Sequence, residues 1–291
     1  MLPENVRSTL THLRLPFSIF LAPVFFFALS ESNEIHKGQA IAGFLLMHFL
    51  LFPASNAYNS YYDKDEGSIG LIESPPPTSR TLLLTALGMD LAAILLSLVL
   101  KLGSFFTIYL ILYGLVSKAY SHPAIRLKKY PLVSLLTVSV FQGFYTFLAS
   151  YQLVSGAAPD ILWSKVFVPA VLSGLNLLAI YPLTQIYQHE EDKIHGDLTY
   201  SRLVGIRGTF LHAAITFLVS FASFGYWYSS TGRVERWFLF GAFMIPVIIY
   251  FLYWWKKTLH NELAANYTNT MRMSALASVF LNIFFIILSL G

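Results

Sequence analysis

Long apolar runs constrain this chain more than any other feature of its sequence. Nine of them approach or exceed the roughly 20 residues that an α-helix needs to cross the hydrocarbon core of a bilayer. They lie at residues 14–30, 39–59, 81–100, 104–121, 132–153, 165–188, 209–229, 236–255 and 273–290. The chain is 56% hydrophobic and 12% charged, whereas soluble domains are about 25% charged. We therefore predict an all-α, polytopic membrane protein in which nine transmembrane helices of one domain, residues 1–291, surround a central cavity.

The basic residues predict the orientation of these helices. If the N-terminus faces the cytoplasm, 14 of the 19 Lys and Arg residues lie on the cytoplasmic side and 5 on the other. This positive-inside bias predicts a multi-pass protein whose N-terminus and longer loops are cytoplasmic. The bias also accounts for the net charge of +4, so no nucleic-acid partner is expected. Because the chain has no cysteine, disulfides, thiolate metal sites and cysteine nucleophiles are excluded.

Polar and acidic side chains close the second apolar run. Asn56, Asn59, Asp63 and Glu66 follow the spacing i, i+3, i+7, i+10, so they share one face if the helix continues that far. Ionisable groups cost about 2.5–3.5 kcal/mol each at the centre of a bilayer span. A cluster of them beside an apolar run therefore indicates a function more than a solvated helix end.

A second acidic segment closes the sixth run and repeats the spacing of the first. Gln188 and Asp192 are four residues apart, as Asn59 and Asp63 are, and Glu191 shares their face of a continued helix. This repeated spacing predicts a pseudo-repeat of helices 1–4 and 5–8, followed by helix 9, with one shared site where the halves meet. Carboxylate and amide oxygens are ligands that suit Mg²⁺ bridged to phosphate. We therefore predict a pocket for metal ions and a polyanion, with a diphosphate as the leading candidate.

With these segments the chain resembles the UbiA superfamily of intramembrane prenyltransferases. Asn59 and Asp63 match the first Asn and the middle Asp of the family's motif Asn-Asp-x-x-Asp-x-x-x-Asp. Asp192 matches the last Asp of the second motif, Asp-x-x-x-Asp. The stretch from Tyr120 to Lys128, Tyr-Ser-His-Pro-Ala-Ile-Arg-Leu-Lys, is similar to the family's Tyr-Ser-x-Pro-x-x-Arg-Leu-Lys. The nine predicted helices and the positions of the motifs agree with the family as well, so the resemblance spans essentially the whole chain.

Four positions depart from the family pattern. Ser60, Gly67 and Gln188 stand where the family has Asp, and Ser74 stands where it has Arg. Neighbouring carboxylates that could compensate are Asp65, Glu66, Glu190 and Glu191. Two alternatives to such compensation are equally open: the site binds fewer metal ions, or it binds a different anionic substrate.

The resemblance implies an enzyme that transfers a prenyl group from an isoprenoid diphosphate to a lipophilic or aromatic acceptor through an allylic carbocation, with Mg²⁺ as cofactor and the lipid bilayer as its environment. It implies a catalytic role for Asp63, Asp192 and Asn59. The implied metal ligands are Asp63, Glu66, Glu191 and Asp192. The implied substrate-binding residues are Asn56, Arg80, Lys118, Tyr120, Arg126, Lys128, Tyr181 and Gln188.

Two other functions remain open at this stage. One is a terpene cyclase on the same scaffold, in which a double bond of the substrate itself captures the cation. The other is a non-enzymatic membrane carrier or binder with a degenerate site. Transporters place their polar groups near the bilayer midplane, whereas these acidic clusters lie at helix ends, which favours the transferase. The sequence leaves the acceptor and the prenyl chain length undetermined.

Overall fold

A computed structural model describes residues 3–158 and 166–290, and over these ranges the chain is a bundle of long helices with no strand. The α-helices are α1 (Glu4–His12), α2 (Leu15–Ser18), α3 (Ala22–Ser30), α4 (Lys37–Leu46), α5 (Phe52–Asp63), α6 (Arg80–Val99), α7 (Ser104–Ser121), α8 (Pro131–Val138), α9 (Thr146–Ser155), α11 (Phe167–Gln185), α12 (His189–Ile194), α13 (Tyr200–Ser230), α14 (Val234–His260) and α15 (Tyr267–Leu290). Short 3₁₀ or π turns are η1 (Ile19–Leu21), η2 (Met47–Leu51), η3 (Leu127–Lys129), η4 (Ser139–Tyr145) and η5 (Glu262–Ala264). The predicted all-α class is confirmed.

Eight helical stretches of the described chain are long and apolar enough to cross a membrane. They are Glu4–Ser30, Lys37–Asp63, Arg80–Val99, Pro131–Ser155, Phe167–Gln185, Tyr200–Ser230, Val234–His260 and Tyr267–Leu290. The remaining predicted span forms α7, an 18-residue helix that packs against α6 and carries Lys118 in its last turn. The protein is thus an integral membrane protein with close to the predicted number of spans. Of the predicted span 165–188, residue 165 lies outside the described residues.

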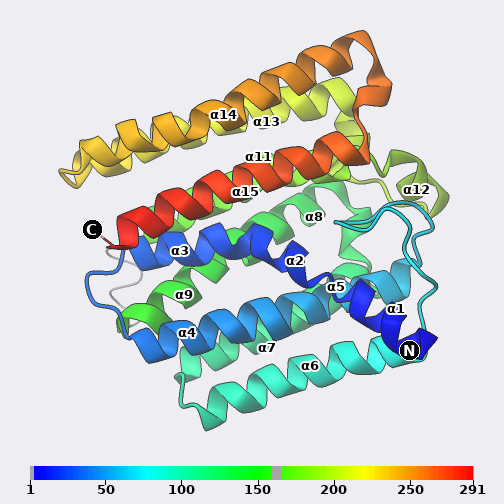
Figure 1. The fold of residues 1–291 in the computed structure, drawn as a ribbon, viewed down its shortest axis with the longest axis horizontal. Helices are drawn as coiled ribbons and strands as arrows, with labels where there is room; N and C mark the ends of the chain where they lie inside the picture. The colour runs from blue at the N-terminus through cyan, green and yellow to red at the C-terminus, as the bar shows by residue number, and fades with distance from the viewer. Residues whose placement is uncertain (1–2, 159–165, 291) are drawn as a thin grey trace.

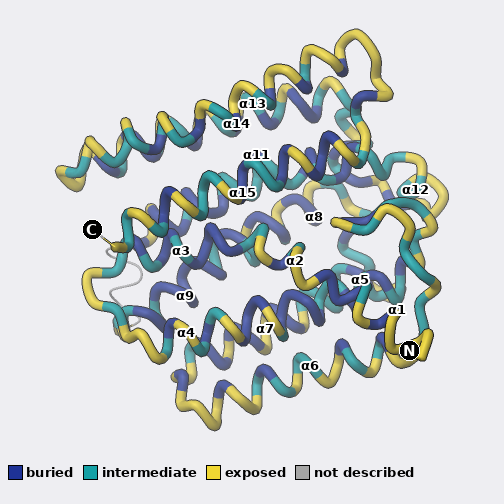
Figure 2. The backbone as a smooth tube through the Cα atoms, in the orientation of Figure 1, coloured by how far each residue is buried: buried dark blue, intermediate teal, exposed yellow. Residues whose placement is uncertain are grey.

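The helices pack side by side along most of their lengths (Figure 1). Helix α3 packs against α9 and α15, α15 against α14, α14 against α13, and α13 against α11, while α5, α6 and α7 pack together on the other flank. Buried residues follow the inner faces, and exposed residues recur along α6, α13 and α14 (Figure 2). Only 22% of the apolar window of α6 is buried, against 56% for the first span. The outward faces of α6, α13 and α14 are therefore apolar surfaces suited to contact with lipid.

One end of the bundle, which we call the loop end, carries residues 64–79, 122–130 and 186–199 together with the N-terminus (Figure 1). Helix α5 stops at Asp63 because Lys64 adopts a left-handed conformation with φ of 52°. Helix α11 stops at Gln185, and α12 follows as a separate short helix. The condition under which Glu66 would share a face with Asn59 and Asp63 is not met, because α5 ends before Glu66. Gln188 and Asp192 do lie one turn apart, since the Asp192 N–H donates to the Gln188 carbonyl at 2.8 Å, but they do so in α12 and not in a continuation of α11.

Two spans contain π turns, and the second brings two helices into backbone contact. In η4, a Cβ placed on Gly143 would lie 2.7 Å from the Cα of Gly174 in α11 and 2.8 Å from the carbonyl oxygen of Ser173. The hydroxyl of Ser139 donates to the carbonyl of Gly174 at 2.7 Å. A wide π turn and two glycines therefore fix how closely these two spans cross.

Replacing Gly143 with alanine should destabilise the protein. Backbone atoms of α11 occupy the space that the new methyl group needs, and overpacking of this kind costs about 1–3 kcal/mol. The matched control is Gly88→Ala in α6, where nothing lies within 4 Å of the added Cβ. There alanine gains up to about 1 kcal/mol of helix propensity. Thermal unfolding in detergent should show a lower Tm for Gly143→Ala and an equal or higher Tm for Gly88→Ala, and equal Tm values for the two would contradict the crossing described.

Candidate active site

A cavity of about 320 Å³ extends into the bundle from the loop end. It is lined by residues of α3, α5, α7, α11 and α15, by the π turn η4 and by the loops at that end. Its charged lining residues are Arg14, Asp63, Asp65, Lys128 and Asp192. All of these belong to the loop end or to the turn before α2, so charge is confined to one end of an otherwise apolar and neutral polar space.

Asp63 lies where the segments of the loop end converge. It is the last residue of α5, and only 4% of its surface is exposed. One carboxylate oxygen accepts a hydrogen bond from the Asn59 amide at 2.6 Å, and the other lies 2.7 Å from the Lys128 ammonium. The Asn59 amide also donates to the Ser121 hydroxyl at 2.9 Å, which joins α5 to the end of α7. Asp63 is thus held in place on both oxygens.

Asp197 is a second buried carboxylate of this network, and the sequence analysis missed it. Arg126 binds it in a fork, with distances of 2.7 and 2.8 Å from two guanidinium nitrogens to the two carboxylate oxygens. The Lys128 ammonium lies 3.2 Å from Asp197, so it bridges Asp197 and Asp63. Burial raises the pKa of Asp197, but the Arg126 hydrogen bonds and the Lys128 charge outweigh burial and lower it overall. The available signal was the position of Asp197, directly after the second motif and Gly196.

Two further carboxylates of the cavity have no basic side chain in direct contact among the described residues. Burial, reinforced by the nearby charge of Asp63, raises the pKa of Asp65 to about 6. Burial also raises the pKa of Asp192 to about 6, although the Thr199 hydroxyl donates to it at 2.9 Å. Such groups gain from a nearby cation, and Mg²⁺ is commonly held by one or two carboxylates together with phosphate oxygens and water. Asp65 and Asp192 therefore fit a magnesium–diphosphate site, although the described residues contain no cluster of three or more potential ligands.

Glu191 makes a different contact from the predicted one. Its two carboxylate oxygens accept hydrogen bonds from the backbone N–H groups of Glu66, at 2.7 Å, and Gly67, at 2.9 Å. A Cβ on Gly67 would collide with the same carboxylate. Neither Glu66 nor Glu191 is part of the cavity lining. The Glu191 carboxylate thus anchors the loop after α5 to α12, and Glu66, the other predicted metal ligand, takes part only through its backbone N–H.

Three of the predicted basic substrate-binding residues also lie outside the lining. Lys118 pairs with Asp90 of α6, and its ammonium lies 5.1 Å from the centre of the Tyr58 ring. Arg80 is exposed at the start of α6, and Arg126 binds the Asp197 carboxylate instead of lining the cavity. The predicted residues that do line the cavity together are Asn56, Asn59, Asp63, Tyr120, Lys128, Tyr181, Gln188 and Asp192. Their roles in binding and catalysis remain predictions.

Arg14 is a lining residue that the sequence analysis treated only as a topology signal. It adopts a left-handed conformation with φ of 48°, and 8% of its surface is exposed. One terminal nitrogen donates to the Asn56 carbonyl at 3.1 Å, while Nε has no protein partner. An incompletely bonded, buried guanidinium at the charged end of a cavity is suited to a polyanion.

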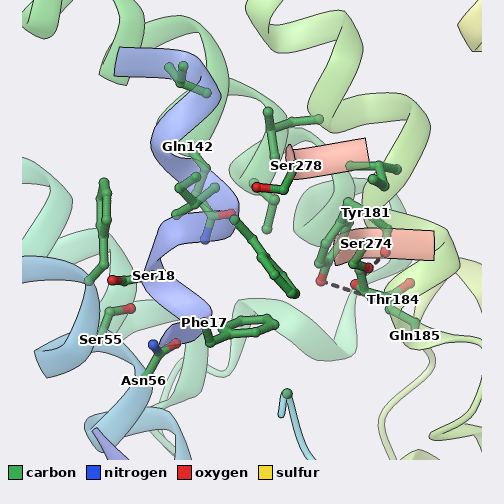
Figure 3. A pocket seen from close by; sticks show the side chains of 18 of the residues that line it. Phe17, Ser18, Ser55, Asn56, Gln142, Tyr181, Thr184, Gln185, Ser274 and Ser278 are labelled. Carbon is green, nitrogen blue, oxygen red and sulfur yellow. Dashed lines mark hydrogen bonds between the residues drawn. The ribbon is translucent and has the colours of Figure 1, made fainter. Parts of the chain in front are cut away.

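Deeper in the cavity, tyrosine and amide groups form a hydrogen-bonded chain (Figure 3). The hydroxyls of Tyr120 and Tyr181 bond to each other, and the Gln185 amide donates to Tyr181 at 2.8 Å. The backbone N–H of Ser201 donates to the Gln185 carbonyl oxygen at 3.2 Å. This chain fixes the aromatic rings directly beyond the carboxylates.

The chain belongs to the UbiA prenyltransferase family, whose pattern matches residues 20–288. Its fold is similar to that of a UbiA homologue from Archaeoglobus fulgidus bound to GPP and Mg²⁺, with a TM-score of 0.69 and 17% identity over 98% of this chain and 100% of the homologue. The structure of that homologue bound to DMAPP and Mg²⁺ has a TM-score of 0.67 and 16% identity, over 96% of this chain and 99% of the homologue. The structure of a digeranylgeranylglyceryl phosphate synthase has a TM-score of 0.60 and 16% identity, over 99% of each chain. Curated proteins give no match.

Because Glu191 accepts two backbone hydrogen bonds from the loop after α5, its removal should make this loop more mobile. Glu191→Ala removes the acceptor of two charge-assisted hydrogen bonds, each worth about 1.5–3 kcal/mol. Amide hydrogen exchange in residues 64–79, followed by mass spectrometry, should therefore become at least about tenfold faster. Glu190→Ala, which alters the neighbouring exposed glutamate, is the control and should leave exchange unchanged. Equal protection in both variants would show that Glu191 does not hold the loop.

Proposed function

We propose that this chain transfers a prenyl group from a prenyl diphosphate to a lipophilic or aromatic acceptor within the membrane, with the loop end in the cytoplasm. The observation that carries the proposal is a single cavity with carboxylates and two buried cations at one end and an apolar, aromatic interior. A prenyl diphosphate has the same division between a highly charged head and an apolar tail. Family membership and the prenyl diphosphates and Mg²⁺ bound to the archaeal homologue support this assignment.

The residues at the charged end bind the diphosphate and offset its charge. Asp65 and Asp192 would hold Mg²⁺, which when bound neutralises charge on the leaving diphosphate. Lys128 and Arg14 supply positive charge at the same end of the cavity. Preorganised charges of this kind stabilise the transition state without a reorganisation cost, because the Asp63 and Asp197 contacts already fix Lys128.

The aromatic interior protects the cation that forms. The C1–O bond of the donor breaks, and the diphosphate leaves with the electron pair. Electrons of the acceptor then form the new bond to C1, and the acceptor releases a proton. Aromatic faces stabilise an allylic cation by cation–π attraction and exclude the water that would capture it. The aromatic lining residues are Phe17, Phe20, Phe27, Phe52, Tyr113, Tyr120, Phe141, Tyr181, Tyr187, Phe217 and Phe285.

Removing either motif aspartate should abolish most turnover. Asp63→Asn and Asp192→Asn keep side-chain size but remove one charge from the site, so each should lower product formation by at least about 100-fold. Lys257→Gln changes an exposed residue of α14 and serves as the control. The measurement is mass spectrometry of prenylated lipids in membranes that contain equal amounts of each protein and a defined prenyl diphosphate. Near-normal product from both aspartate variants would refute the assignment, and a cyclised hydrocarbon in place of a prenylated acceptor would point to the cyclase.

Chelation of Mg²⁺ should weaken donor binding. Asp65 and Asp192 repel a diphosphate unless a cation lies between them, so EDTA should reduce the affinity for the thiolo analogue of geranyl diphosphate at least about tenfold. Binding is measured by calorimetry with and without Mg²⁺, and the same experiment on Asp192→Asn should show a smaller effect of Mg²⁺. Equal affinity with and without the metal would indicate that the substituted motifs no longer form a metal site.

A further inference from the structure

The cavity contains a second polar region, remote from its charged end. We call Gln142, Ser173 and Asn176 the inner polar group; all three line the cavity. Asn176 precedes the end of α11 at Gln185 by nine residues, which corresponds to about 13 Å along a helix. An uncharged polar side chain at such depth is costly unless a hydrogen-bond partner satisfies it. The reaction at the diphosphate does not require them.

The backbone crossing at Gly143 and Gly174 brings this group together. Gln142 precedes Gly143 in the π turn, and Ser173 precedes Gly174, so both flank the point where the two spans touch. Turns of the π type are frequent at functional sites. Figure 3 shows Gln142 beside the cavity, apart from Thr184 and Gln185.

Ser173 and Asn176 have hydrogen-bonding capacity that the described protein groups leave unused, whereas Gln142 also lies beside the Tyr113 hydroxyl. The Ser173 hydroxyl has no partner although only 2% of the residue is exposed. The Asn176 carbonyl oxygen accepts from the Ser220 hydroxyl at 2.8 Å, which orients the amide of this cavity-lining residue. Buried polar groups are normally satisfied, so unpaired ones beside a cavity indicate a ligand that completes them.

The distribution of charge restricts that ligand. The two basic lining residues, Arg14 and Lys128, lie at the loop end, where the diphosphate needs them. No basic residue among the described lining residues accompanies the inner polar group. An anionic group placed there would be desolvated without a counter-charge, whereas hydroxyl or carbonyl groups would be satisfied by the two amides and by Ser173.

We propose that the inner polar group is the subsite for an uncharged acceptor that carries hydroxyl or carbonyl groups. The inference rests on the proposed prenyl transfer and specifies the class of its second substrate. Gln142 and Asn176 bond the oxygen atoms of the acceptor that are remote from the reacting atom. The reacting atom is thereby directed toward the Tyr120–Tyr181 pair and the donor carbon.

The test compares two ring compounds that differ by one charge. The full-length protein in detergent, with Mg²⁺ and the thiolo analogue of geranyl diphosphate, is titrated anaerobically with 1,4-dihydroxynaphthalene and with its 2-carboxylate. The neutral ring should bind at least about tenfold more tightly. Gln142→Leu and Asn176→Leu should each weaken its binding by about tenfold, as the loss of one hydrogen bond to a buried group allows. The affinity for the donor analogue should stay within twofold.

Gln152→Leu is the matched control, because Gln152 lies further along the same span and outside the cavity lining. It should leave both affinities unchanged. If Asn176→Leu fails to fold without its Ser220 contact, Gln142→Leu alone decides the outcome. Equal or tighter binding of the carboxylate, no saturable binding of the neutral ring, or unchanged affinity for it in the folded variants would overturn the subsite. Failure of the unaltered protein to bind the donor analogue would instead overturn the proposed function, and the subsite with it.

Discussion

The geometry of the site depends on one buried ammonium group, that of Lys128, between two carboxylates. Asp63 ends α5, Lys128 lies in the turn after α7, and Asp197 follows α12, so three separate segments meet in this contact. Breaking a buried pair by removing one partner costs about 3–5 kcal/mol, because the other charge is left uncompensated. Burial lowers the pKa of Lys128, but the two carboxylates outweigh burial and raise it, which keeps the bridge charged.

The sequence predicts the membrane-spanning helices well because length and apolar composition are local properties of each segment. It fails at helix ends, where contacts between distant segments decide the outcome. The spacing of Asn59, Asp63 and Glu66 fits a continuous helix, yet the chain turns at Lys64 and its next residues bond to Glu191. A periodic pattern carries no information about such a partner, which lies 125 residues away along the chain.

Site residues are predictable from the sequence where a motif supplies them and less so where burial defines them. Asp63, Lys128 and Asp192 line the cavity as the resemblance implies. Arg14 was counted only among the topology residues, because basic residues near span ends also serve topology. Lys118 was predicted to bind substrate, but it pairs with Asp90 and lies outside the lining. For Lys118 a signal existed. Asp90 lies in the middle of an apolar run, and an unpaired charge there is costly enough to demand a basic partner on a neighbouring helix.

The substituted motif positions change how a metal ion would be held. At position 67 a glycine replaces the family's aspartate, and the Glu191 carboxylate occupies the space beside it as an anchor for the loop. Asp63 and Asp197 are already neutralised by Lys128 and Arg126, which leaves Asp65 and Asp192 as the carboxylates with unmet charge. Two carboxylates fill few of the six positions around Mg²⁺, so phosphate oxygens and water must supply the others. Metal and diphosphate would then each need the other, so that the charged end is completed only when the donor is bound.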